Sequence, residues 1–171
     1  DQEITAVKDW WDARGITIVG MQALMFGTTG LNMFGTNESR SAMLSHLASI
    51  CRIGSQLGAS KLVFGSPRNR DLSGLEAHDA TDRAVSFFRT LGDIAQTHGV
   101  EICLEPNPPS YGANFMIDSI ETAHIINIVS HPSIRMQLDT GAMFINGECP
   151  PEVIAKNSHL IGHIHLSEPQ L

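Results

Sequence analysis

Three polar residues stand at the ends of apolar, strand-like runs, and their types are those that bind metal ions. Glu105 ends VEICLE, Asp139 ends RMQLD, and His165 lies near the end of LIGHIHL. Neighbouring parallel strands lie about 4.8 Å apart, so side chains from three strand ends can share one ion at ligand distances of about 2 Å. Two carboxylates and an imidazole suit Mn²⁺, Mg²⁺, Co²⁺ or Zn²⁺. The sequence therefore predicts one divalent metal ion at this place.

Each of the three residues also has a purely structural interpretation. Glu105 could pair with a cation or cap a helix, Asp139 could be a turn aspartate, and His165 could be a satisfied core histidine. Their shared position at successive strand ends favours the metal site. His163 lies on the same strand face as His165, one layer deeper, because side chains two residues apart share a face. We expect His163 either to face the substrate or to be a core histidine.

The elements that must position these residues alternate between strand and helix patterns. Strand-like runs cover residues 16–24, 61–65, 100–105, 134–139 and 160–166, and helical patterns cover 38–57, 80–98, 119–129 and 150–157. Asn37 is the expected N-cap of the first of these helices, Gly58 its expected end, and Asp118 with Glu121 a capping pair for the third. Strands that alternate with helices predict βαβ units and a parallel sheet.

The last three strands have one apolar and one polar face. The polar face is predicted to hold Glu101, Cys103 and Glu105, then Arg135, Gln137 and Asp139, then Ile161, His163 and His165. An open doubly wound sheet needs two apolar faces, whereas a barrel can hold polar groups inside, below a site at its carboxyl-terminal mouth. A glycine-rich phosphate loop is absent from the sequence. We expect residues 26–35 to form a long loop at the mouth.

Composition excludes several classes of protein. The 171 residues, 42% of them hydrophobic, predict one domain over residues 1–171 with a sizeable core. A formal charge of −7 makes nucleic acid a poor partner. The sequence has no apolar run of about 18 residues and no signal-peptide pattern at its start, so we expect no membrane contact and a cytoplasmic location. Cys51, Cys103 and Cys149 match no zinc or redox motif.

Four segments resemble a known family. LVFGSPRNR, CLEPNP, QLDTG and GHIHLSEP together resemble the sugar phosphate isomerase/epimerase family of xylose isomerase-like TIM barrels, over roughly residues 16–171. The resemblance implies an incomplete α/β barrel, approximately strands three to seven of eight with the intervening helices. It matches Glu105, Asp139 and His165 to the family's metal ligands on three successive strands. It also implies a fourth ligand, a glutamate on the eighth strand, beyond these 171 residues.

The resemblance also implies a reaction. A glutamate removes the proton beside a sugar carbonyl and an enediolate forms with metal support, so Glu105 is expected to be both ligand and base. Arg68 and Arg70 follow the second strand and could hold a phosphate or carboxylate of the substrate, or belong to a solvated loop. Asn107 and Glu168 lie beside the expected rim, and Asn107 is a further candidate for substrate binding.

One departure from the family narrows the number of metal ions that the site is expected to hold. Apurinic endonucleases of the same superfamily hold three zinc ions with additional histidines. At the corresponding places this chain has Gln22, Ser66 and Ala142. The sequence therefore predicts a mononuclear site and not a trinuclear DNA-repair site.

Three functions remain open on this evidence. The first is a metal-dependent isomerase or epimerase of a sugar or sugar phosphate. The second is a non-catalytic truncated barrel that binds metal or a small polyol, and the third is a metal-dependent hydrolase or lyase. An arc of five strands has two unpaired edges and a polar interior. We therefore expect self-association or rearranged terminal segments to cover the edges.

Overall fold

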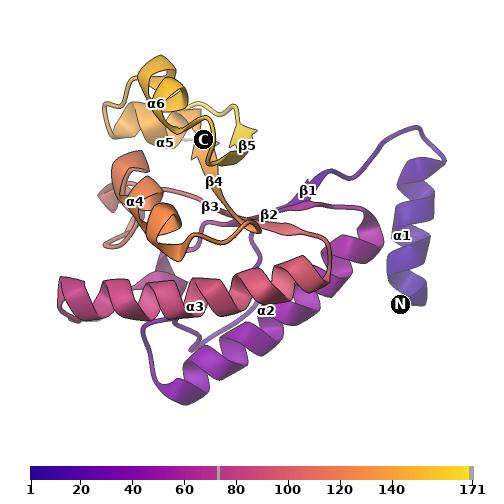
Figure 1. The fold of residues 1–171 in the computed structure, drawn as a ribbon. Helices are drawn as coiled ribbons and strands as arrows, with labels where there is room; N and C mark the ends of the chain where they lie inside the picture. The colour runs from indigo at the N-terminus through magenta and orange to yellow at the C-terminus, as the bar shows by residue number, and fades with distance from the viewer. Residues whose placement is uncertain (73, 170–171) are drawn as a thin grey trace.

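The fold alternates helices and strands along the chain (Figure 1). The computed structural model describes residues 1–72 and 74–169, so positions 73, 170 and 171 of the predicted domain lie outside the described residues. The elements in order are α1 (Gln2–Asp12), β1 (Gly20–Met21), α2 (Asn37–Leu57), β2 (Lys61–Phe64), the 3₁₀ turn η1 (Pro67–Arg70), α3 (Ala77–Thr97), β3 (Glu101–Leu104), the 3₁₀ turn η2 (Pro109–Tyr111), α4 (Ser119–Val129), β4 (Ile134–Asp139), α5 (Thr140–Ile145), α6 (Pro150–Asn157) and β5 (Ile161–His165).

The five strands form one parallel sheet in the order β1-β2-β3-β4-β5. Each strand pairs with its neighbour in sequence, and the helices α2, α3 and α4 lie along one side of the strands (Figure 1). This arrangement is a half-barrel, so the predicted α/β fold with an incomplete parallel barrel is confirmed. The carboxyl ends of all five strands point toward the same rim.

Local sequence signals set the helix ends. The Thr36 hydroxyl accepts a hydrogen bond from the Ser39 N–H, so the N-cap of α2 is Thr36 and the prediction of Asn37 was wrong by one residue. Gly58 ends α2 in the left-handed region at φ 82°, as expected for a C-terminal glycine. At α4 the predicted pair is confirmed, because the Asp118 carboxylate accepts from the Glu121 N–H at 2.8 Å.

The core lies between the outward face of the sheet and the helices. Strands β2, β3 and β4 bury Leu62, Phe64, Ile102, Leu104, Ile134, Met136 and Leu138 on this side. The Phe64 ring meets Phe88 of α3 edge to face, with 5.8 Å between ring centroids. The predicted apolar face is therefore confirmed for β3 and β4. On β5 the same face is open, since Leu166 just after the strand is 87% exposed.

A β-bulge changes the pattern of β5. Ile161 pairs with Met136, but His163 pairs with Gln137, so the strand gains one residue at Gly162. Ile161 therefore packs against the core instead of lying on the polar face, where it was predicted. His163 and His165 keep their predicted inner face. Gly162 allows the bulge, because a Cβ there would lie 2.7 Å from the Cβ of Arg135.

The first strand is shorter than its sequence pattern predicts. Only Gly20 and Met21 pair with β2, and the chain turns away at Ala23, whose φ is 55°. A Cβ at Gly20 would lie 2.8 Å from the Lys61 carbonyl oxygen, so the strand can approach β2 only with glycine there. Among the described residues, none of the helices combines the length and the apolar character that crossing a bilayer requires.

Candidate metal centre

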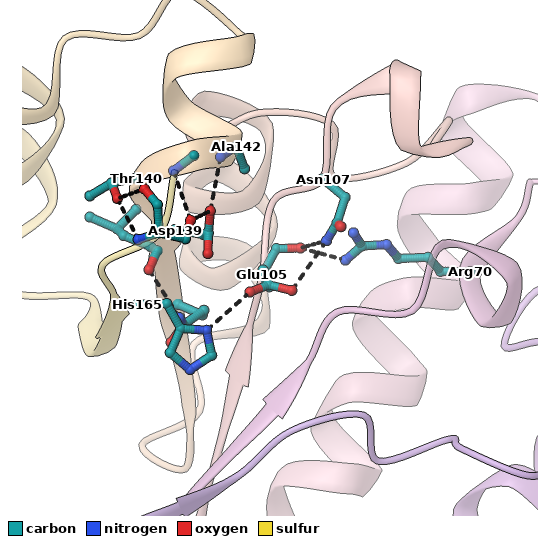
Figure 2. A network of polar contacts seen from close by, with 11 residues as sticks. Arg70, Glu105, Asn107, Asp139, Thr140, Ala142 and His165 are labelled. Carbon is teal, nitrogen blue, oxygen red and sulfur yellow. Dashed lines mark hydrogen bonds and ion pairs between the residues drawn. The ribbon is translucent and has the colours of Figure 1, made fainter. Parts of the chain in front are cut away.

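The side chains of Glu105, Asp139 and His165 converge at the carboxyl ends of β3, β4 and β5 (Figure 2). One ligand atom from each of them lies within 4.8 Å of the other two. Nδ1 of His165 lies 3.7 Å from Oε1 of Glu105. All three side chains are half-buried. The structure thus brings together the three residues that the sequence predicts to be ligands.

Asp139 has two structural partners in addition to its place in the cluster. It is the N-cap of the short helix α5, and its Oδ1 accepts from the Ala142 N–H at 2.9 Å. The same oxygen accepts from the Ser167 hydroxyl at 2.7 Å. Within the described residues both hydrogen bonds go to Oδ1, which leaves Oδ2 available to a cation. Ala142 contributes only its backbone, in agreement with a single-metal arrangement.

The segment after β5 is tied to the start of α5. The Thr140 hydroxyl donates to the Ser167 carbonyl at 2.7 Å and accepts from the Ser167 N–H at 2.9 Å. The Gly141 N–H donates to the Ser167 hydroxyl at 3.0 Å, and a Cβ at Gly141 would lie 2.7 Å from that oxygen. Sequence reasoning missed Ser167 and Thr140. They lie 27 positions apart, and no local pattern links a strand end to a serine so far along the chain.

The surroundings of Glu105 disfavour the ionised form of its carboxyl group. Burial, and then the negative charge of Asp139, raise the pKa of its carboxyl above the ordinary value. A Cβ at Gly65 would lie 2.0 Å from Oε2 of Glu105, so the glycine after β2 makes room for the carboxylate. A divalent cation between the two carboxylates would remove their repulsion. The donor set and the electrostatics both fit such an ion.

Two predicted substrate-binding residues lie behind Glu105. Asn107 is buried, and its Nδ2 lies 3.2 Å from the carbonyl oxygen of Glu105 and 3.5 Å from Oε2. Arg70 is fully buried, and its Nη1 donates to the same carbonyl at 2.7 Å (Figure 2). Burial lowers the pKa of Arg70 to about 10, so the guanidinium remains charged at neutral pH. Both side chains contact Glu105 in this structure.

The other two predicted residues are closer to solvent. Arg68 is exposed at the edge of a cavity that Glu105 also lines. The His163 ring packs edge to face on His165, with 5.1 Å between centroids. Burial, followed by His165 and Lys61, lowers the pKa of His163. His163 is therefore neutral at neutral pH and can donate one hydrogen bond and accept another.

Three hollows surround the cluster. A cavity of about 760 Å³ is lined by the loop after β1, by Ser66, Arg68 and Asn69, and by Glu105, so the predicted loop does lie at the mouth. A second cavity of about 570 Å³ lies between β1 and β5 and is lined by Asp139, His163 and His165 among others. A third, of about 180 Å³, adds Asn107 and Glu168. The cluster is thus open to small molecules from more than one side.

Solved structures of sugar epimerases share this fold. The 3-keto-D-glucoside 4-epimerase YcjR from E. coli superposes with a TM-score of 0.81 at 17% identity, over 98% of this chain and 65% of that one. D-psicose 3-epimerase from Clostridium cellulolyticum, solved with D-tagatose, gives 0.78 at 19% identity, over 95% and 56%. D-allulose 3-epimerase from Methylomonas sp., in complex with D-allulose, gives 0.74 at 20% identity, over 96% and 57%.

The chain thus spans between 56% and 65% of the length of these three epimerases, and the likeness establishes the fold. No curated protein sequence matches the chain. A family model, described as the xylose isomerase-like TIM barrel, matches residues 1–170. The predicted family resemblance and the incomplete barrel are therefore confirmed, and the chain belongs to the xylose isomerase-like TIM barrel family.

Proposed function

We propose that this chain carries the metal site of a divalent-metal-dependent sugar isomerase or epimerase. The observation that carries the proposal is the convergence of Glu105, Asp139 and His165 at three adjacent strand ends, with ligand atoms within 4.8 Å of one another. The fold shared with sugar epimerases supports it. Mn²⁺, Mg²⁺, Co²⁺ and Zn²⁺ all accept two carboxylates and one imidazole. Cys103 is not a candidate ligand, because burial raises the pKa of its thiol to about 12.

In this proposal Glu105 is both ligand and base. When bound, the ion would supply Lewis-acid stabilisation of the negative charge that develops on the carbonyl oxygen as the neighbouring proton is removed. In the metal-free chain burial and Asp139 raise the pKa of Glu105, whereas a bound cation lowers it, so the metal-bound carboxylate is ionised and can accept a proton. Asn107 steadies the carboxylate through its Nδ2. Return of the proton on another face or carbon needs a second acid, which the family resemblance assigns to a glutamate on a further strand.

The substrate proposed for this site is a sugar or a sugar phosphate. The cavity beside Glu105 carries hydroxyl and amide groups that suit sugar hydroxyls, among them Thr28, Thr29, Ser66 and Asn69. Neutral His163 could hydrogen-bond a hydroxyl from the other side. Arg68, exposed at the edge of the first cavity, is the residue that could hold a phosphate or carboxylate.

The location and the assembly of the chain remain proposals of the same kind. We expect a cytoplasmic protein and self-association that covers the two open edges of the sheet. The motivation for self-association is that large apolar side chains are exposed at both edges, Val19 next to β1, and Ile164 and Leu166 at β5. Sedimentation of the purified chain tests the idea, and a monodisperse monomer with protease-accessible edges would refute it.

Hydrogen exchange in D₂O tests the activity. The chain, loaded with Mn²⁺ or stripped with a chelator, is incubated with D-fructose, D-tagatose and D-psicose, and deuterium next to the carbonyl is followed by NMR. We expect metal-dependent exchange that falls by about 10²- to 10⁴-fold in Glu105→Gln. Metal binding without exchange would support the non-catalytic metal- or polyol-binding alternative. Phosphoester hydrolysis without exchange would support the hydrolase alternative.

A further inference from the structure

Arg70 is a fully buried cation that has no role in the proposed reaction. It ends the 3₁₀ turn η1, which follows β2, and none of its side chain is exposed. Its Nη1 donates to the Glu105 carbonyl, but Nε and Nη2 have no hydrogen-bond partner among the described residues. Arginine is rarely fully buried unless it is paired, because desolvating a charge is costly. So costly an arrangement requires a reason.

Among the described residues, the Arg70 side chain makes one hydrogen bond, and its acceptor is the backbone of a proposed metal ligand. The Glu105 carbonyl oxygen accepts from Arg70 at 2.7 Å and from Asn107 at 3.2 Å. The Glu105 N–H donates to the Phe64 carbonyl at 3.1 Å. Both backbone groups of Glu105 are therefore anchored, directly before Pro106 ends the strand. Since the backbone sets the direction in which a side chain leaves it, these anchors aim the carboxylate.

We propose that Arg70 is a positioning residue, which holds the end of β3 so that the Glu105 carboxylate points at Asp139 and His165. The inference rests on the proposed metal site. Arg70 acts through the Glu105 backbone and does not touch the substrate. A guanidinium is planar and pre-organised, and this one is buried with its Nη1 on the Glu105 carbonyl, which suits the task of holding a strand end.

A purely electrostatic role makes the opposite prediction. Arg70 lies near Glu105 and Glu121, and its charge stabilises ionised carboxylates. If charge were its only contribution, its removal would leave fewer positive charges near a cation, and at a pH at which Glu105 is ionised metal would bind more tightly. If Arg70 positions Glu105, its removal weakens metal binding. The sign of the change therefore separates the two roles.

The experiment compares Arg70→Met and Arg70→Lys with a matched control, Arg89→Met. Arg89 also donates to backbone carbonyls, those of Val129 and Ile128 at 3.1 and 2.9 Å, away from the cluster. Mn²⁺ affinity is measured by calorimetry, and the ligand geometry is followed in the visible spectrum of the Co²⁺-loaded chain. We expect Arg70→Met to weaken binding by about 10- to 100-fold and to change the spectrum, with partial recovery in Arg70→Lys. Arg89→Met should bind like wild type.

Unchanged or tighter binding in Arg70→Met, with an unchanged spectrum, would overturn the inference. Should Arg70→Met fail to fold, a crystal structure of metal-free Arg70→Gln, whose side chain is too short to reach the Glu105 carbonyl, decides the question. In that variant the 3.7 Å separation of Glu105 Oε1 and His165 Nδ1 should be lost or lengthened, and retention of the wild-type geometry would contradict the positioning role. This second measurement needs no metal. A wild-type chain that binds no metal would refute the proposed function while leaving the Arg70 inference open to this structural test.

Discussion

The two faces of the half-barrel sheet differ in the interactions that hold their side chains in place. On the face toward the helices, β3 and β4 bury apolar side chains such as Ile102, Leu104 and Met136 against the core. On the inner face the same strands carry Glu101, Glu105, Arg135 and Gln137, together with the histidines of β5. Apolar contacts are non-directional, whereas the polar contacts of the inner face depend on particular partners in particular orientations.

The inner face also tolerates unsatisfied polar groups. Gln137 is fully buried, its Nε2 donates to the Leu138 carbonyl at 2.9 Å, and its Oε1 has no partner within the described residues. Such an arrangement weakens a fold, so the inner face adds little to stability. The comparison teaches that stability resides mainly on the outer face and binding chemistry on the inner one. Substitutions on the two faces should therefore affect different measurements.

The largest expected effect comes from truncation on the outer face. Phe88 is fully buried against Phe64, and Phe88→Ala should lower the free energy of unfolding by about 3–5 kcal/mol. Chemical denaturation measures the change. The control Phe144→Ala removes a phenyl ring that is 72% exposed and should change stability by no more than about 0.5 kcal/mol. Equal effects of the two substitutions would contradict the assignment of stability to the buried face.

The second effect concerns the proposed ligand Asp139. At a metal concentration of about 100 times Kd, binding should stabilise wild type by about 2.7 kcal/mol, and Asp139→Asn should lose this gain because the amide is a poor ligand. Asn keeps an oxygen that can cap α5, whereas Asp139→Ala also removes the cap and should cost about 1 kcal/mol more without metal. Thermal melts with and without metal separate the two losses. A metal-dependent gain in Asp139→Asn equal to that of wild type would exclude Asp139 as a ligand.

Two glycines, one at each face of the sheet, allow a direct comparison of the two faces. A Cβ at Gly54 of α2 would lie 2.9 Å from Leu62 on the outer face, and a Cβ at Gly65 would lie 2.0 Å from Glu105 on the inner one. Both alanine variants should lose about 1–3 kcal/mol of stability through overpacking. Only Gly65→Ala should weaken metal binding, because only there does the carboxylate have to move. Calorimetric titration of both variants checks this, and equal affinities would remove the proposed steric link between Gly65 and the site.

The sequence predicted those parts of the structure that depend on local patterns. Alternation along β3 and β4 indicated which side chains face the helices, and the ends of β3, β4 and β5 indicated the cluster. The bulge at Gly162 could not be predicted, because the need for glycine there arises from its close approach to Arg135 on the neighbouring strand. Local patterns also missed α5. This helix has only six residues, and it depends on the Asp139 cap and on Ser167, which is far away in the sequence.

The burial of Arg70 was beyond the reach of sequence patterns for a different reason. Arginine after a strand is usually exposed, so the sequence left two expectations open, binding of a substrate anion and a place in a solvated loop. Its complete burial follows from how η1 packs under the end of β3, a contact between segments 35 positions apart. Long-range packing therefore determines the burial of Arg70, which local sequence patterns do not show.

The smallest expected effect is a change in pH dependence on the inner face. The pKa of Glu105 is raised in the folded chain, chiefly by burial and then by Asp139. Above the unfolded-state value of about 4.3 the native state therefore binds more protons than the unfolded state, and stability falls as pH rises toward the raised native pKa. In the metal-free chain Glu105→Gln removes this penalty. It should melt above wild type at neutral pH, and the difference should shrink as pH falls toward about 4.3.

The matched control for this effect is Glu101→Gln, the same substitution on the same strand. Glu101 pairs with Lys61 at 2.7 Å, and both side chains are partly open to water, so its loss should lower stability by at most about 1 kcal/mol. Glutamine should therefore stabilise the metal-free chain at position 105 and slightly destabilise it at position 101. Melting curves across pH in a chelator test this, and a metal-free Glu105→Gln that melts below wild type at neutral pH would contradict it. Saturating metal should then reverse the order at position 105, because wild type regains through the ion what it loses by holding two carboxylates together.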